Sequence, residues 1–80
     1  MEEIVWDRYE CTEGEIQVFK TTWKGHQIKC WGWNNHDEDL DVKVDGKEIS
    51  GKVNATRVRS LTPNDLDWFI QKLKWQEEAK

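Results

Sequence analysis

The stretch from Thr62 to Lys80, TPNDLDWFIQKLKWQEEAK, constrains the fold most, because it carries both the start and the spacing of an amphipathic helix. Thr62 suits the capping position, Pro63 the first helical position, and Asp65 the reciprocal side of a capping box. Apolar residues then recur at the spacing of one helical face. They are Leu66, Phe69, Ile70 and Leu73. We therefore predict a helix over residues 63–78 that packs on a core through this face.

The two tryptophans of this helix, Trp68 and Trp75, lie seven residues apart and fall opposite the apolar face. Tryptophan is enriched at the energetic centres of protein interfaces, so this pair is our first candidate binding site. The alternative is that a loop or the N-terminal strand covers both rings, or that they are scattered exposed aromatics of the kind that monomers tolerate. The sequence leaves these alternatives open.

Upstream of the helix, extended segments are separated by two-residue turn signals, Lys24-Gly25 and Asp45-Gly46. Asp-Gly favours a type I′ hairpin turn. The expected strands cover residues 3–9, 15–23, 26–33, 40–44 and 47–58. A run of strands followed by a helix is typical of the α+β class. We predict a single domain over residues 1–80, with a four- to five-stranded antiparallel sheet or small SH3-like barrel and one C-terminal helix.

The two turns also predict how the strands of each hairpin are aligned. The first turn places Trp23 opposite His26, and the second places Leu40 opposite Gly51. A glycine inside a strand indicates a bulge or a bend. Both faces of the first hairpin carry apolar side chains, so we expect a curved sheet covered on both sides, or a small barrel.

VFKTTWKG at residues 18–25, followed by a late strand and a closing helix that begins SLTPNDL, resembles the pattern of chromodomains and SH3-like barrels. The resemblance covers about a third of the chain and implies a small barrel with a helix across it. That family also places a tryptophan in the third strand, before acidic and proline residues. This chain has Trp31-Gly32-Trp33 in that region without the rest, so no functional residue of the family is transferred to it.

The composition limits both the core and the compartment. Six tryptophans among 80 residues are far more than a small domain ordinarily carries, and some of them must build the core. No apolar run approaches the roughly 18 residues of a membrane span. The acidic start, MEEIVWDRYE, predicts neither a secretory signal nor a transit peptide, so we expect a cytoplasmic protein without membrane contact. There, Cys11 and Cys30 are expected as reduced, buried thiols.

The net charge of −4 is distributed in bands along the chain. Acids concentrate in residues 1–15 and 34–48, and bases in residues 16–33 and 49–61. These bands offer no continuous basic patch for a phosphate backbone, so nucleic acid is a disfavoured partner. The acidic loop that begins NNHDED offers a negative patch that would steer a basic partner. Its candidate binding residues are Asp37, Glu38, Asp39 and Asp41.

Residue spacing gives little support for a metal site or for catalysis. The acids between residues 37 and 48 follow the spacing of a calcium loop, except that Val42 stands where that loop needs glycine. The two cysteines and two histidines lack the close pairs of a zinc site. The chain also lacks the spacing of a nucleophilic triad and a glycine-rich phosphate loop. We therefore expect no metal, no cofactor and no enzyme activity.

A second aromatic surface supplies an alternative function. Trp31 and Trp33 share one strand face, which Lys29 continues. An open face of this kind could stack a sugar or a base, or hold a methylated amine by cation–π attraction. The opposing interpretation is that Val18, Ile16 and the helix cover it.

The sequence as a whole predicts a small acidic protein-binding module, an adaptor or inhibitor of the kind that bacteria or phages encode. It would act by surface complementarity through Trp68, Trp75 and the acidic loop. The expected partner is another protein with a basic or apolar patch, or a second copy of the chain. The alternative is a reader of a small ligand or a modified residue through Trp31, Trp33 and Lys29.

Overall fold

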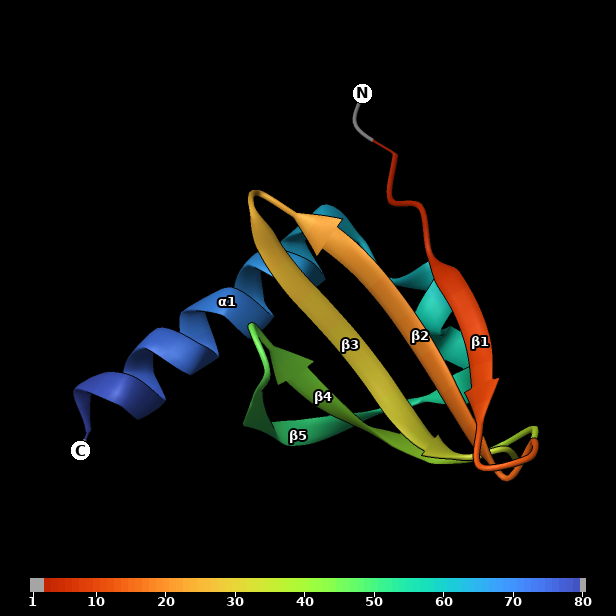
Figure 1. Cartoon of the computed structure of the whole chain (residues 1–80). Coiled ribbons are helices and arrows are strands. Elements are labelled where there is room, and N and C mark those ends of the chain that lie inside the picture. The colour runs from red at the N-terminus through yellow and green to blue at the C-terminus, as the bar shows by residue number, and fades with distance from the viewer. Residues whose placement is uncertain (1–2, 80) are drawn as a thin grey trace.

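The computed structural model describes residues 3–79, which form a five-stranded sheet, one 3₁₀ helix and one α-helix (Figure 1). The strands are β1 (Asp7–Cys11), β2 (Ile16–Trp23), β3 (His26–Trp33), β4 (Asp39–Val44) and β5 (Lys47–Asn54). They are followed by the 3₁₀ helix η1 (Ala55–Ser60) and by α1 (Pro63–Glu78). The strands pair in sequence order as an antiparallel meander. The predicted α+β fold is confirmed, and the sheet is open, because β1 and β5 are its two edges and do not close into an SH3-like barrel.

Both tight turns have the backbone geometry that their residues favour. Lys24-Gly25 has φ angles of 50° and 80°, and Asp45-Gly46 has 53° and 80°. Two successive positive φ angles are the mark of a type I′ turn, whose twist matches that of the paired strands. The Asp45 carboxylate contacts His26 Nδ1 at 2.7 Å and accepts the Gln27 N–H at 2.9 Å. These hydrogen bonds, that of His26 first, lower the pKa of Asp45 and hold the second turn against the start of β3.

The first strand begins later than the predicted range of residues 3–9. Thr21 Oγ1 donates a hydrogen bond to the Val5 carbonyl at 2.7 Å, so a side chain engages this carbonyl. Trp6 is buried and Ile4 packs against the core. The alternation of apolar residues fits a strand. Because the Trp6 ring is buried in the core, however, the segment before Asp7 does not pair with β2, and the strand begins at Asp7.

The register of the second hairpin differs from the prediction at its far end. Leu40 pairs with Val53 and not with Gly51, because the register shifts between Asp41 and Val42. Gly51 has a φ angle of 100°, which glycine adopts without strain. The irregularity expected at Gly51 is therefore present as a bulge, and the bulge moves the pairing of Leu40 by two residues.

The last strand ends at Asn54, and not at residue 58 as predicted. The Asn54 side chain accepts a hydrogen bond from the Thr56 N–H at 3.0 Å and begins η1. Asparagine favours such local bonds over the strand ladder. The 3₁₀ turn places Val58 in the core, where its side chain is completely buried.

Replacing Gly51 with alanine is expected to lower the free energy of unfolding by about 1–3 kcal/mol, because a residue with a Cβ is strained at this φ. The new Cβ would also lie 2.9 Å from Lys72 Nζ, which donates to the Ser50 carbonyl. Urea denaturation measures the change. Ser50→Ala, at the neighbouring exposed position, is the control and should change the value by less than about 0.5 kcal/mol. If both changes lower the free energy of unfolding by the same small amount, alanine is not strained at position 51.

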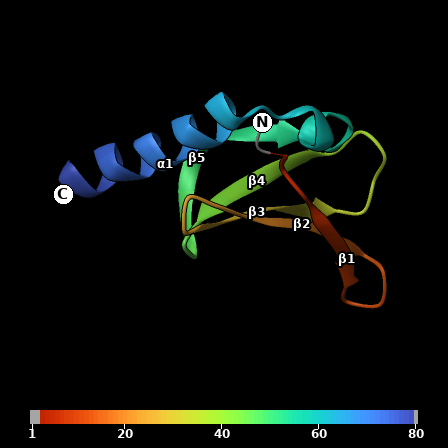
Figure 2. The ribbon, with the colours of Figure 1, turned by 90° about the horizontal axis from the view of Figure 1, so that it is seen from above.

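The core lies between the sheet and α1, which crosses over β5 and β4 (Figure 2). The capping box is complete, since Thr62 Oγ1 accepts the Asp65 N–H and an Asp65 carboxylate oxygen accepts the Thr62 N–H. Leu66, Ile70 and Leu73 are buried on the face that the apolar spacing predicts. Among the described residues, no helix is long and apolar enough to cross a membrane.

Side chains of α1 also cover the edge of β5. The Gln76 amide pairs with this edge as a strand would, because Nε2 donates to the Glu48 carbonyl at 3.0 Å and Oε1 accepts the Ser50 N–H at 2.8 Å. Lys72 Nζ donates to the Ser50 carbonyl at 2.6 Å. An open strand edge invites pairing with other chains. These bonds therefore fix the position of the helix and block that edge.

The two cysteines lie on opposite faces of the sheet. Cys30 is buried on the core side, and burial raises the pKa of its thiol to about 12. Cys11 pairs with Ile16 on the other face and is exposed, contrary to the expectation that both thiols are buried. Both thiols are free.

Candidate functional site

Trp68 and Trp75 lie side by side on the side of α1 that faces away from the core. Their side chains are 50% and 49% exposed. The ring centroids are 5.2 Å apart and the ring planes meet at 82°, an edge-to-face contact. Within residues 3–79, neither the N-terminal segment nor a loop buries them, so the alternative that the rings are covered is wrong for the described part of the chain.

The pair is held on a rigid support. The N-terminal half of α1 packs on the sheet, and its C-terminal half extends past the sheet edge (Figures 1 and 2). The bonds of Lys72 and Gln76 to β5 anchor this second half. Burying the exposed half of both rings would contribute about 5 kcal/mol, taking about 100 Å² for each ring and about 25 cal/mol per Å². The cost of association offsets part of this gain.

The acidic loop is partly neutralised by its own neighbours. Asp41 forms an ion pair with Lys52 at 2.8 Å, and Asp39 accepts a hydrogen bond from Asn54 at 3.2 Å. Glu38 accepts one from the Asn35 side chain at 3.2 Å. Asp37 is exposed, and only its backbone carbonyl contacts Asn54.

The structure does not bring this loop to the tryptophan pair. The loop joins β3 to β4 at one end of the sheet, whereas the C-terminal half of α1 projects from the other end (Figures 1 and 2). A single contact surface therefore does not include both sets of predicted residues.

The third predicted set lies on the face of the sheet that points away from α1, which we call the open face. No helix or strand among residues 3–79 covers this face of β2 and β3 (Figures 1 and 2). Trp33 is 58% exposed there. Trp31 is only partly exposed, and the Lys43 ammonium lies 5.1 Å from its ring centroid. The two rings thus differ in access, and Trp31 is already in contact with a cation.

Two further lysines of the open face, Lys20 and Lys43, flank the predicted Lys29 and were not among the predicted site residues. Lys29 pairs with Lys20 on β2 and with Lys43 on β4. The pairing with Lys20 follows from the first turn and was open to prediction. The pairing with Lys43 was not, because the loop between β3 and β4 is too long to fix a register.

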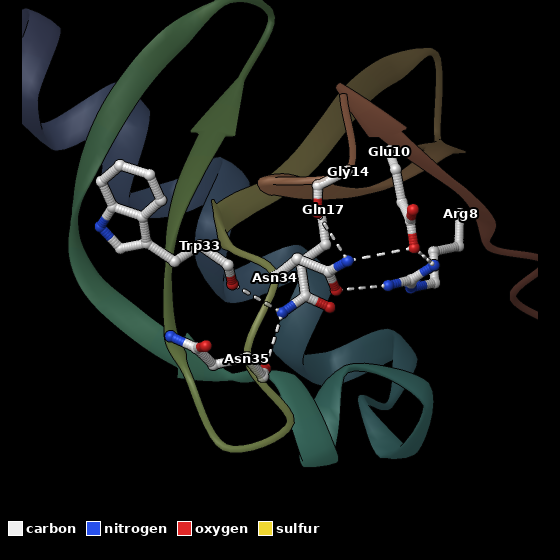
Figure 3. Close-up of polar contacts among 7 residues, drawn as sticks. All are labelled: Arg8, Glu10, Gly14, Gln17, Trp33, Asn34 and Asn35. Carbon is white, nitrogen blue, oxygen red and sulfur yellow. Dashed lines mark hydrogen bonds and ion pairs between the residues drawn. The ribbon is translucent and has the colours of Figure 1, made fainter. Parts of the chain in front are cut away.

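A network of polar side chains joins the β1–β2 turn to the end of β3 (Figure 3). Asn34 is its centre: Nδ2 donates to Glu10 at 3.1 Å and to the Gly14 carbonyl at 2.9 Å, while Oδ1 accepts from Arg8 at 2.8 Å. Arg8 and Glu10 also form an ion pair at 3.1 Å. These polar groups form hydrogen bonds with one another, so the network holds the β1–β2 turn against the end of β3.

The buried Gln17 extends this support on the core side of the sheet (Figure 3). Its Nε2 donates to the carbonyls of Trp33 and Asn35, both at 2.9 Å. A cleft of about 620 Å³ opens beside it. Arg8 and Arg59 border the cleft, and their guanidinium groups lie 5.8 and 5.7 Å from the Phe19 ring centroid. Arg8 is already bound to Glu10, so the cleft presents less free positive charge than its two arginines indicate.

Within residues 3–79, no three His, Cys, Asp or Glu side chains form a group that could hold a metal ion. The acids of the calcium-like spacing are instead distributed along a hairpin, with Asp41 bound to Lys52 and Asp45 to His26. Comparison of the chain with models of protein families, with curated proteins and with solved structures finds no match.

Proposed function

We propose that this chain is a small protein-binding module, an adaptor or inhibitor, that inserts Trp68 and Trp75 into an apolar groove of a partner protein. The observation that carries the proposal is the pair of half-exposed rings in mutual contact on a helix whose other face is committed to the core. Large aromatic anchors of this kind dominate the binding energy of protein interfaces.

The spacing of the pair suits a helix that lies in a groove. Anchors at positions i and i+7 fall on one line along a helix, and partner grooves read such lines. Two residues lie between the rings at helical spacing: Gln71 is uncharged, and Lys72 donates to the Ser50 carbonyl on β5. This favours an apolar groove with a polar rim over a charged surface. The acidic loop, at the other end of the sheet, would assist by steering a basic partner.

Changing Trp68 and Trp75 together to alanine is expected to weaken partner binding by at least about 100-fold, since each anchor of this type contributes about 2 kcal/mol or more. The immobilised chain captures partners from an extract of the source cells, and mass spectrometry quantifies them. Calorimetry with the purified partner then gives the change in affinity. Thermal unfolding of the variant should stay close to that of the unchanged chain, because both rings are half-exposed.

The matched control changes Lys74 and Glu78, two exposed residues of the same helix, to alanine. Capture of the same proteins in the same amounts by both variants would show that the tryptophan pair is not the binding site. Light scattering at several concentrations tests a second copy of the chain as the partner. If the chain forms a dimer that dissociates when Trp68 and Trp75 are changed to alanine, the partner is a second copy of the chain and not another protein.

A further inference from the structure

Three lysines stand in one row across the open face of the sheet. Lys29 on β3 is directly paired with Lys20 on β2 and with Lys43 on β4. They are far apart in the sequence, so a search for basic runs along the chain does not find them. Side chains at paired positions point to the same side of a sheet, and their Cβ atoms lie about 5 Å apart. Asp7 on β1 and Glu48 on β5 are paired with the two outer lysines, so the row carries three positive and two negative charges and is most positive at Lys29.

Among the described residues, the two acids at the ends of the row form no ion pair with its lysines. No carboxylate among residues 3–79 lies within 4.0 Å of Lys20, Lys29 or Lys43. By contrast, lysines elsewhere on the surface form ion pairs. They are Lys24 with Asp67, Lys47 with Glu77 and Lys52 with Asp41. Like charges directly opposite one another on neighbouring strands destabilise a sheet, and a bound anion would remove that cost.

Aromatic side chains lie beside the row on the same face. One step along the strands, Trp31 stands between Val18 on β2 and Asp41 on β4, and Tyr9 follows Val18 on β1. Trp33 lies one further step along β3. Trp33 is 58% and Tyr9 40% exposed, so both present ring surface to solvent. The open face therefore presents ammonium groups and exposed aromatic rings next to one another.

The shape of the face limits the size of the ligand groups. The cleft at the lysine row has a volume of about 110 Å³ and is lined by Lys20, Gln27, Lys29, Lys43 and Gly46. This is far below the roughly 300 Å³ or more of a pocket for a whole small molecule. It suits a single tetrahedral anion such as a phosphate group. The ring of Trp33, by contrast, is open and suits a flat group stacked on it.

We propose that the open face binds single-stranded nucleic acid, with backbone phosphates on Lys20, Lys29 and Lys43 and a base stacked on Trp33. A cationic track beside aromatic platforms is the combination by which proteins hold single strands without reading their sequence. An acidic peptide would use the lysines, but it offers a ring to Trp33 only where an aromatic residue stands beside its carboxylates. A duplex hides its bases from an exposed ring. The net charge of −4 keeps the contact short, because the rest of the surface repels a polyanion.

The test uses the intact chain and a fluorescein-labelled 12-nucleotide oligo(dT), with binding followed by anisotropy at 50 mM salt. We expect saturable binding in the micromolar range, and a slope of log K against log salt of about −2, from three phosphate contacts. Changing Lys20, Lys29 and Lys43 together to glutamine should weaken binding at least about 10-fold and bring the slope close to zero. Trp33→Ala should weaken it about 5- to 150-fold.

The matched control changes Lys24, Lys47 and Lys74 to glutamine, which gives the same net charge with the open face intact. It should bind oligo(dT) nearly as well as the unchanged chain. The melting temperature separates binding from folding, because a variant that melts like the unchanged chain but binds weakly has lost the site and not the fold. The variant with Trp68 and Trp75 changed to alanine should bind oligo(dT) normally, so a failure of the proposed protein-binding function would not affect this result.

Three outcomes would overturn the proposal. The first is no saturable binding of oligo(dT) at 50 mM salt. The second is an equal loss of affinity in the two triple-glutamine variants, which would mean that net charge alone matters. The third is heparin or a DNA duplex bound as tightly as oligo(dT), with no effect of Trp33→Ala. The open face would then be a general surface for polyanions.

Discussion

Replacing Leu66 with alanine is expected to lower the free energy of unfolding by about 3–5 kcal/mol, a large share of the stability of so small a domain. Leu66 has no exposed surface and lies where α1 packs on the sheet. Its loss leaves a cavity that the two rigid elements cannot close. Urea denaturation followed by tryptophan fluorescence gives the change.

Trp68→Ala is the matched control, two residues further along and on the opposite side of the helix. It removes a larger side chain but should cost less than about 1.5 kcal/mol, because the ring is half-exposed and contacts the equally exposed ring of Trp75. Destabilisation equal to that of Leu66→Ala would mean that Trp68 supports the core. The proposed binding surface on α1 would then lose its basis.

The helix and the tight turns were predictable because their signals are local. Thr62 and Asp65 form the capping box within one turn, and the apolar residues after them define the buried face. Asp45-Gly46 adopts two positive φ angles for reasons internal to the dipeptide. Each of these features depends on residues within a few positions of one another, so the sequence suffices to place it.

The errors occur where distant side chains compete with local pattern. The alternation from Ile4 to Tyr9 fits a strand, but the strand starts at Asp7 because Trp6 is buried in the core and Thr21 engages the Val5 carbonyl. The pairing of Leu40 was shifted by a bulge whose size a single glycine does not reveal. Both outcomes depend on packing between segments, which periodicity does not describe.

The candidate surfaces divide in the same way. That Trp68 and Trp75 lie opposite the core follows from helical spacing alone. That they stay exposed depends on where the N-terminal segment runs, and the sequence left this open. To predict the lysine row, one must know how β2, β3 and β4 are aligned. The loop between β3 and β4 does not determine the alignment of β4. Charge counted along the chain therefore does not reveal the lysine row that pairing across the sheet produces.

The second large effect is expected at Trp23, which links the first hairpin to α1. The Trp23 side chain is 7% exposed, and its Nε1 donates to Asp67 Oδ1 at 2.9 Å. Lys24 forms an ion pair with the same carboxylate at 3.0 Å. Trp23→Ala should lower the free energy of unfolding by about 3–5 kcal/mol, because it removes both the buried ring and this link. Trp23→Phe keeps most of the ring and removes only the donor, so its cost should be smaller.

The cost of Trp23→Phe should also depend on pH. The hydrogen bond from Trp23 first, and that from Lys24 second, lower the pKa of Asp67 in the folded state. A carboxyl group with a lowered pKa binds protons more weakly in the folded than in the unfolded chain. Its contribution to stability is therefore present above the unfolded pKa of about 3.9 and is lost as the pH falls through the folded value. The difference between the unchanged chain and Trp23→Phe should accordingly shrink between pH 7 and pH 3.

Trp6→Phe provides the matched control for this pH effect. Trp6 is 8% exposed, close to the value for Trp23, but its Nε1 is buried without a hydrogen-bond partner among the described residues. Its replacement removes a similar volume and no bond to a carboxylate, so its cost should be the same at pH 7 and pH 3. Urea denaturation at both pH values measures the two differences. A parallel response of both variants would mean that acid acts on the core as a whole, and that the bond between Trp23 and Asp67 does not couple α1 to the first hairpin.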